Sequence, residues 1–203
     1  CEKLGVKEYL VKPIKLESLS EKIKTFFQSA ILIFFGSTLI LVLLLRLFNP
    51  YITTFMLYRY FTGDSEEHII KKEWKDYREI SRNIKRAVIA SEDQNFFNHF
   101  GFDLTAIKKA FFHNFKKNHK KIHGASTITQ QVAKNLFLFP NRNWLRNGLE
   151  VYFTLILELL WSKQRILEVY LNIIELGKGV YGIEKASLIN FKKSSKNLTA
   201  DEA

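Results

Sequence analysis

The pattern of hydrophobic and polar positions begins with one long apolar segment. No charged residue occurs from Thr25 to Leu45. As an α-helix at about 1.5 Å per residue, such a stretch spans roughly 30 Å, the hydrocarbon thickness of a bilayer. A cleaved signal peptide fits less well because its apolar region is shorter, and the buried helix of a soluble domain would carry polar positions. The pattern therefore predicts a single transmembrane helix over residues 25–48.

The rest of the chain has the periodicity of amphipathic helices. An aromatic and apolar stretch over residues 49–60 is broken by the sequence TGDS, after which a soluble domain is expected to start. We find neither an internal repeat nor an alternating run typical of a strand, so the fold class is predicted to be mainly α. The predicted helices lie near residues 84–91, 103–115, 127–138, 144–161 and 163–176.

Basic residues gather on the N-terminal side of the apolar segment. Only Arg46 and Arg59 follow the segment closely, whereas Lys7, Lys12, Lys15, Lys22 and Lys24 precede it. This asymmetry predicts an N-terminus in the cytoplasm and a domain on the outer side of the membrane. The predicted organisation is a cytoplasmic segment over 1–24, a transmembrane helix over 25–48, a membrane-proximal linker over 49–65 and a domain over 66–203.

The segment before the span has a pattern of its own. Residues 9–11 are typical of a short strand, a Lys-Pro turn follows, and an amphipathic helix comes next. This segment resembles the end of a response-regulator receiver domain, without the phospho-acceptor aspartate. Coincidence and the remnant of a longer fusion are the two interpretations.

Composition narrows the classes of function. The net charge of +11 predicts attraction to an anion, which leaves nucleic acid, anionic lipid and a phosphorylated substrate open. The single cysteine, Cys1, excludes an intrachain disulfide and a cysteine-based zinc site. Nucleic acid is not expected as a partner because the basic domain is predicted to lie outside the cell.

The stretch GASTITQQVAKN is unusually polar for this chain. Thr127 is followed three residues later by Gln130, a capping-box pattern that predicts the start of a helix. On this helix Thr127, Gln131 and Lys134 share one face with Asn135 beside them, next to the positive end of the helix dipole. The arrangement is suited to an anion. A capped surface helix with solvated polar side chains is the alternative. The neighbouring apolar stripe comprises Ile128, Val132 and Leu136.

Two further stretches carry carboxylates. Glu92 and Asp93 follow the apolar run AVIA, and a carboxylate at the edge of a core is a candidate base, which we assign to Glu92. For Asp93 and His99, local hydrogen bonds at a helix end are the alternative. Arg146 and Glu150 are one helical turn apart and should form an ion pair.

A last polar stretch, SKQRILEVYLN, is interpreted as mainly structural. Arg165, Glu168 and Asn172 share one face of the predicted helix. Lys163 and Arg165 are candidate contacts for an anion.

Together these stretches form a recognisable series. In order, EDQNFFNHFG, GASTITQQVAKN, RNGLE, SKQRILEVYLN and GVYGIEKAS resemble the five motifs of the family 51 glycosyltransferases, the peptidoglycan polymerases. The resemblance covers residues 50–203 and implies a lysozyme-like, α-helical domain on the outer face of the cytoplasmic membrane. Its substrate would be lipid II, from which undecaprenyl pyrophosphate is released.

The resemblance also implies roles for individual residues. Glu92 matches the general base that deprotonates the acceptor 4-hydroxyl as it attacks C1 of the donor, which gives an inverted β-1,4 link. Arg146 matches the cation that stabilises the leaving pyrophosphate, and Glu150 the second essential carboxylate. The remaining matches are expected to bind substrate: Asp93, Phe96 and His99 in the first motif, and Thr127, Gln131, Lys134 and Asn135 in the second.

No cofactor is required by the sequence. Mg²⁺ or another divalent cation assists some family members, but no metal-ligand cluster is visible in the sequence, so no metal ligand is assigned. The implied partners are lipid II, the growing glycan strand, membrane lipid and proteins of the divisome or elongasome. The basic run over residues 116–121 lies where the family has a mobile segment near the membrane, and a solvated loop is the alternative.

The sequence departs from the family pattern in three places. Asn147 stands where the family usually has Lys, which removes a positive charge from the pyrophosphate site and is expected to reduce turnover. Asn190 precedes Phe191 where Tyr-Phe is usual, a change expected to affect packing. The family continues with further helices beyond the position of Ala203, so a truncated domain is expected.

Two other functions compete with the glycosyltransferase. A lytic glycosidase would also use a carboxylate, but cleavage of a glycan needs no pyrophosphate site. A membrane-anchored, non-catalytic scaffold would bind lipid II or divisome proteins without turnover. A bifunctional penicillin-binding protein is disfavoured because the chain has no Ser-x-x-Lys motif.

Overall fold

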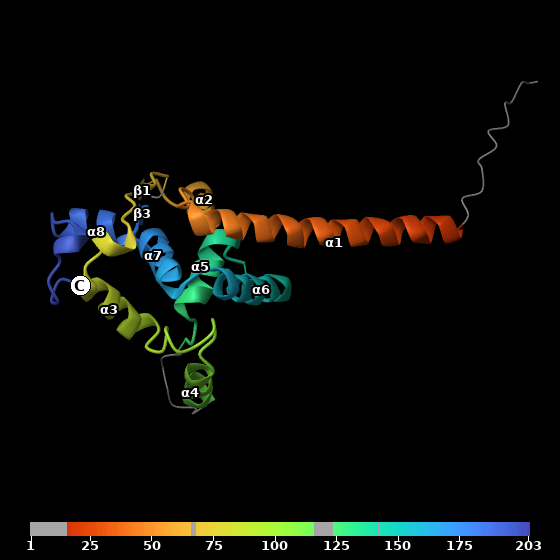
Figure 1. Ribbon diagram of the computed structural model, residues 1–203. Coiled ribbons are helices and arrows are strands. Elements are labelled where there is room, and N and C mark those ends of the chain that lie inside the picture. The colour runs from red at the N-terminus through yellow and green to blue at the C-terminus, as the bar shows by residue number, and fades with distance from the viewer. Residues whose placement is uncertain (1–15, 66–67, 116–123, 142) are drawn as a thin grey trace, which may run out of the picture. The chain divides into compact units, whose positions relative to one another are not determined.

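The computed structural model describes residues 16–65, 68–115, 124–141 and 143–203 (Figure 1). The chain divides into two compact units, residues 1–41 and 42–203. The predicted strand over residues 9–11, the receiver-like turn and the basic run over 116–121 lie outside the described residues.

The first unit is dominated by the helix α1 (Leu16–Leu47), which continues a short way into the second. Residues Leu19–Leu47 are long and apolar enough to cross a membrane, and large side chains such as Phe26 and Leu32 are exposed along them. In the described part of the chain this is the one helix that meets those criteria. It is consistent with a single-pass membrane anchor. The helix begins at Leu16, nine residues before the predicted start of the span at Thr25, because the amphipathic stretch that precedes the span is part of the same helix.

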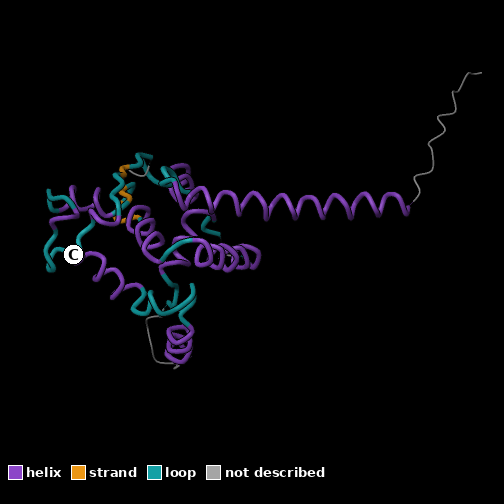
Figure 2. Tube along the Cα trace, in the orientation of Figure 1, coloured by secondary structure: helices purple, strands orange, loops and turns teal. Residues whose placement is uncertain are grey.

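The second unit is mainly α, as the periodicity predicts (Figure 2). Each predicted helix is present, and α7 ends three residues earlier than expected because Ile174 is already extended. The helices are α2 (Thr54–Thr62), α3 (Arg82–Glu92), α4 (Leu104–Phe115), α5 (Ile128–Phe137), α6 (Trp144–Leu160), α7 (Lys163–Ile173) and α8 (Ile183–Asn190), with short 3₁₀ turns η1 (Tyr77–Glu79) and η2 (Ser195–Asn197).

A small sheet, which the sequence analysis did not predict, joins distant parts of the chain. It consists of β1 (Lys71–Lys72), β2 (Glu175–Gly177) and β3 (Val180–Tyr181) in the order β1-β3-β2. The central strand is β3. Strand β1 pairs with β3 in parallel, and β2 pairs with β3 in the antiparallel sense. Strands of two or three residues are too short to show an alternating pattern, so they cannot be predicted from periodicity.

Helix α5 occupies the centre of the second unit, between α6 and α7 (Figure 1). Its apolar stripe, Ile128, Val132 and Leu136, is buried as predicted. The ring of Phe137 stacks on Phe153 of α6 with centroids 4.3 Å apart. Each fully buried aliphatic side chain contributes about 1.5–3 kcal/mol, so this helix is a rigid base for the polar residues on its other face.

Gly182, between β3 and α8, has a backbone conformation that side chains disfavour. Its φ is +81°, and a Cβ added there would lie 2.8 Å from the carbonyl oxygen of Asn172. We expect Gly182→Ala to lower the free energy of unfolding by about 3 kcal/mol, measured by thermal or denaturant unfolding.

Gly148→Ala is the matched control. Gly148 is exposed within α6, and an added Cβ meets no atom within 4 Å. This variant should gain about 1 kcal/mol from helix propensity. Equal effects of the two substitutions would contradict the steric argument.

Candidate active site

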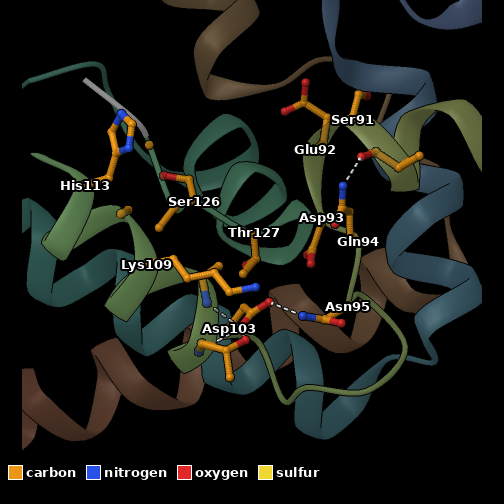
Figure 3. A pocket seen from close by; sticks show the side chains of 16 residues that line it. Ser91, Glu92, Asp93, Gln94, Asn95, Asp103, Lys109, His113, Ser126 and Thr127 are labelled. Carbon is orange, nitrogen blue, oxygen red and sulfur yellow. Dashed lines mark hydrogen bonds between the residues drawn. The ribbon is translucent and has the colours of Figure 1, made fainter. Parts of the chain in front are cut away.

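A pocket of about 390 Å³ opens between the end of α3, one face of α4 and the segment that precedes α5. Glu92 and Asp93 lie on one side, and Lys109 and His113 of α4 lie across the pocket from Glu92 (Figure 3). Thr127 lines the wall formed by the start of α5. The pocket therefore combines a carboxylate wall with a wall that carries a lysine and a histidine.

Glu92 is the last residue of α3 and is exposed to the pocket. Gln131 Nε2 donates a hydrogen bond of 2.9 Å to Glu92 Oε2, and Tyr170 OH donates one of 3.2 Å to Gln131 Oε1. Burial, and then the charge of Glu92, raise the pKa of the Tyr170 hydroxyl, which keeps it a donor. The chain Tyr170–Gln131–Glu92 thus fixes the orientation of the carboxylate.

Asp93 and His99 interact with each other inside the protein. His99 Nε2 lies 2.8 and 3.0 Å from the two carboxylate oxygens of Asp93, and the backbone N–H of Ile128 donates to Asp93 Oδ2 at 3.0 Å. Asp93 therefore satisfies a free N–H group in the first turn of α5. The contact with His99 fits the alternative of local hydrogen bonds at a helix end, whereas the bond from Ile128 joins Asp93 to a distant helix.

Phe96 also has an internal position. Its side chain is fully buried, and Lys163 Nζ lies 4.6 Å from the centre of its ring. Phe96 is therefore inside the protein and does not line the pocket. The substrate-binding role that the resemblance implies for Phe96 stays a prediction.

Thr127 forms the predicted capping box. Its hydroxyl accepts the N–H of Gln130, whose side-chain oxygen accepts the N–H of Thr127. The same hydroxyl donates to the carbonyl of Gly101 at 2.6 Å, which ties α5 to the loop that follows α3. The hydroxyl thus has a structural role in the free protein, although the residue lines the pocket.

A buried ion pair that the sequence analysis missed joins three helices. Glu158 of α6, with 3% of its side chain exposed, accepts hydrogen bonds from Thr129 Oγ1 at 2.5 Å and from Lys163 Nζ at 2.7 Å. Lys163, a candidate anion contact from the sequence, is thus paired inside the protein. The cluster Thr129–Glu158–Lys163 fixes α5 against α6 and α7.

Arg146 and Glu150 form the predicted ion pair on α6. Arg146 Nη1 lies 2.8 Å from Glu150 Oε2, and each side chain is 16% exposed. Arg146 Nε also donates to the carbonyl of Phe139 at 3.3 Å. The structure does not place this pair in the lining of the pocket that contains Glu92.

Some residues of the second motif line the pocket and others do not. Lys134 is partly buried and Asn135 is buried on α5, and neither belongs to the pocket lining. Of the predicted site residues, Glu92, Asp93 and Thr127 line the pocket. Gln131 reaches it through its hydrogen bond to Glu92.

Comparison with known proteins decides the family. The sequence model of the transglycosylase family matches residues 62–203. The chain belongs to the transglycosylase family. It is 47% identical to the biosynthetic peptidoglycan transglycosylase of Bdellovibrio bacteriovorus over 190 residues, which cover 93% of this chain and 75% of that protein. The resemblance found in the sequence motifs is thereby confirmed.

Two other transglycosylases are similar over most of the chain. The biosynthetic peptidoglycan transglycosylase of Haemophilus influenzae is 49% identical over 180 residues, covering 87% of this chain and 74% of that protein. The biosynthetic peptidoglycan transglycosylase of Bacteroides thetaiotaomicron is 41% identical over 184 residues, covering 90% of this chain and 73% of that protein.

In this transglycosylase, Asp103 is a pocket residue that the sequence analysis missed. Its carboxylate accepts hydrogen bonds from Thr105 and from the backbone N–H of Ala106, at the first turn of α4, and from Asn95 Nδ2 at 2.8 Å. These bonds, led by that of the Thr105 hydroxyl, hold the pKa of Asp103 far below its usual range. An Asp at the start of a predicted helix is a capping signal that could have identified it.

Asn147, the departure in the third motif, contacts the neighbouring arginine. Its side-chain oxygen accepts a hydrogen bond of 3.3 Å from Arg146 Nη1. The guanidinium of Arg146 thus donates one of its N–H groups to a neutral amide, at the position where the family motif usually has a lysine.

No group of three or more His, Cys, Asp or Glu side chains suited to a metal occurs in residues 16–65, 68–115, 124–141 and 143–203. In the pocket, Asp93, Asp103 and Glu92 all accept hydrogen bonds from groups of the protein. The use of a divalent cation stays a prediction.

Proposed function

We propose that this transglycosylase polymerises lipid II into β-1,4-linked glycan strands and releases undecaprenyl pyrophosphate. As a member of its family the protein is a peptidoglycan glycosyltransferase of cell-wall synthesis. The observation that carries the detailed proposal is the exposed Glu92 carboxylate in the pocket, oriented by Gln131.

Glu92 would act as the general base. It accepts the proton of the acceptor 4-hydroxyl while that oxygen forms a bond to C1 of the donor. The bond between C1 and the diphosphate oxygen breaks on the opposite face, so the configuration at C1 inverts. Gln131 fixes the orientation of the Glu92 carboxylate, since the Gln131 amide is itself hydrogen-bonded to Tyr170.

Arg146 would stabilise the charge that develops on the leaving diphosphate. Cations placed before the reaction lower the barrier because no reorganisation is needed when the charge appears. Glu150 holds the guanidinium through the 2.8 Å ion pair, which gives the second carboxylate a positioning role. Lys134 on α5 is the second cation proposed for the diphosphate.

The membrane supplies the substrate in this proposal. Helix α1 anchors the chain, and the excess of lysines before it favours a cytoplasmic N-terminus and a catalytic domain on the outer face. Lipid II and the growing strand would enter from the same leaflet. Divisome or elongasome proteins are proposed as further partners.

The proposal is tested by incubating the purified chain with fluorescent lipid II in vesicles and, separately, with preformed glycan strands. Polymer formed from lipid II, with intact preformed strands, supports the transferase. Shortening of preformed strands without polymer formation would identify a lytic glycosidase. Binding of lipid II without turnover would favour the scaffold.

Asn147→Lys is expected to raise kcat/KM roughly fivefold, because a second cation beside Arg146 stabilises the leaving diphosphate. Initial rates of lipid II polymerisation measure the effect. Asn147→Ala is the matched control, since it removes the 3.3 Å contact with Arg146 without adding charge. The same gain from both variants would attribute it to the released guanidinium, and no gain from the lysine would contradict the electrostatic argument.

A further inference from the structure

Arg165, in the first turn of α7, holds the C-terminal end of α1. Its Nη2 donates to the carbonyl oxygens of Leu45 at 2.9 Å and Phe48 at 3.0 Å, and its Nη1 donates to Asn49 Oδ1 at 2.8 Å. Glu168, one turn along α7, lies 3.3 Å from Nη1. One guanidinium therefore makes three hydrogen bonds to the segment where the membrane helix ends.

The chemistry of a helix end explains this choice of side chain. The last carbonyl groups of an α-helix have no partner within the helix, and they carry the negative end of its dipole. A guanidinium offers five N–H donors in a rigid, planar fork, so it can satisfy several of these oxygen atoms at once. A lysine lacks this planar fork and could make only some of the three hydrogen bonds.

Two aromatic rings hold the guanidinium in place. Its central carbon lies 5.5 Å from the ring centre of Trp74 and 5.8 Å from that of Trp161. The side chain is 13% exposed. Cation–π attraction adds to the hydrogen bonds when the cation is largely desolvated, as here.

Two other side chains bind the same segment. Trp161 Nε1 donates to the carbonyl of Val42 at 2.9 Å, and Lys72 Nζ donates to the carbonyls of Pro50 and Tyr51 at 2.5 and 3.1 Å. Burial lowers the pKa of Lys72 to about 8. Five carbonyl groups between residues 42 and 51 are thus held by side chains of β1, α7 and Trp161, the residue that follows α6.

Helix α7 connects this clamp with the pocket. Arg165 lies in its first turn, and Tyr170, further along the same helix, donates to the Gln131 amide that orients Glu92. We propose that Arg165 is a positioning residue, which fixes the last turn of the anchor to the catalytic domain so that the pocket meets membrane-embedded substrate at a set height. The inference rests on the proposed function.

The test compares two substrates for Arg165→Met: lipid II embedded in vesicles, and a short-chain lipid II analogue dissolved in detergent. We expect the rate on the embedded substrate to fall roughly tenfold or more, because misplaced reactants lose rate steeply, while the rate on the soluble analogue stays within about twofold. Amide hydrogen exchange over residues 48–52 should become faster. Arg165→Lys should recover part of the embedded rate, and Arg78→Met, on an exposed residue of η1, should change neither rate.

Each other outcome overturns the inference. Equal losses on both substrates would place Arg165 in the chemistry or in folding, and full activity on both would show that the clamp is not needed. If Arg165→Met fails to fold, Trp161→Phe removes the N–H bond to Val42 while it keeps an aromatic ring, and it must show the same selective loss. A wild-type chain that uses neither substrate would refute the proposed function itself.

Discussion

Glu92→Gln is expected to reduce lipid II polymerisation by roughly two to four orders of magnitude, the contribution typical of a general base. The amide has the shape of the carboxylate but cannot accept the proton of the acceptor hydroxyl. Glu92 is exposed, and its hydrogen bond comes from a neutral amide, so the melting temperature should not change. Initial rates and a thermal scan on the same preparation measure both effects.

Glu79→Gln is the matched control for this substitution. Glu79 is also an exposed glutamate, but it lies in η1 and does not line the pocket. Its replacement should leave the polymerisation rate unchanged. The base assignment is wrong if Glu92→Gln keeps more than a tenth of the wild-type rate, or if the control loses as much.

Lys163→Met is expected to lower the free energy of unfolding by about 3 kcal/mol, because it leaves the carboxylate of Glu158 buried with only the Thr129 hydroxyl as a partner. The loss of the cation above Phe96 acts in the same direction. Denaturant or thermal unfolding of the detergent-solubilised chain measures the change. Activity should fall with the folded fraction, since the cluster holds α5 in place.

Two controls separate the buried pair from ordinary surface charge. Lys178→Met breaks the exposed pair with Asp64 and should have no measurable effect on stability. The double variant Glu158→Gln/Lys163→Met should regain most of the loss, because a neutral amide can still accept from Thr129 without a buried charge. A double variant less stable than Lys163→Met would contradict this explanation.

Local patterns in the sequence predicted the features that depend on neighbouring residues. The capping box at Thr127 and the ion pair between Arg146 and Glu150 join residues three and four positions apart, so helix geometry alone determines them. The buried stripe of α5 follows from its 3.6-residue period in the same way. These features are present as predicted.

Contacts between distant residues could not be predicted in this way. The bond from Gln131 to Glu92 spans 39 positions and that from Thr129 to Glu158 spans 29, and no local pattern reports such pairs. The motif resemblance implied a substrate-binding role for Phe96, but not that its side chain is buried. Burial depends on packing between segments that are distant in the sequence, which only the tertiary structure reveals.

The most direct test of the central claim is a structure of the Glu92→Gln variant with lipid II bound. The claim predicts that the acceptor 4-hydroxyl lies within about 3.2 Å of the side chain at position 92, inside the pocket between α3, α4 and α5. The diphosphate of the donor should lie beside Arg146. An acceptor sugar bound outside this pocket, or with its 4-hydroxyl turned away from position 92, would contradict it.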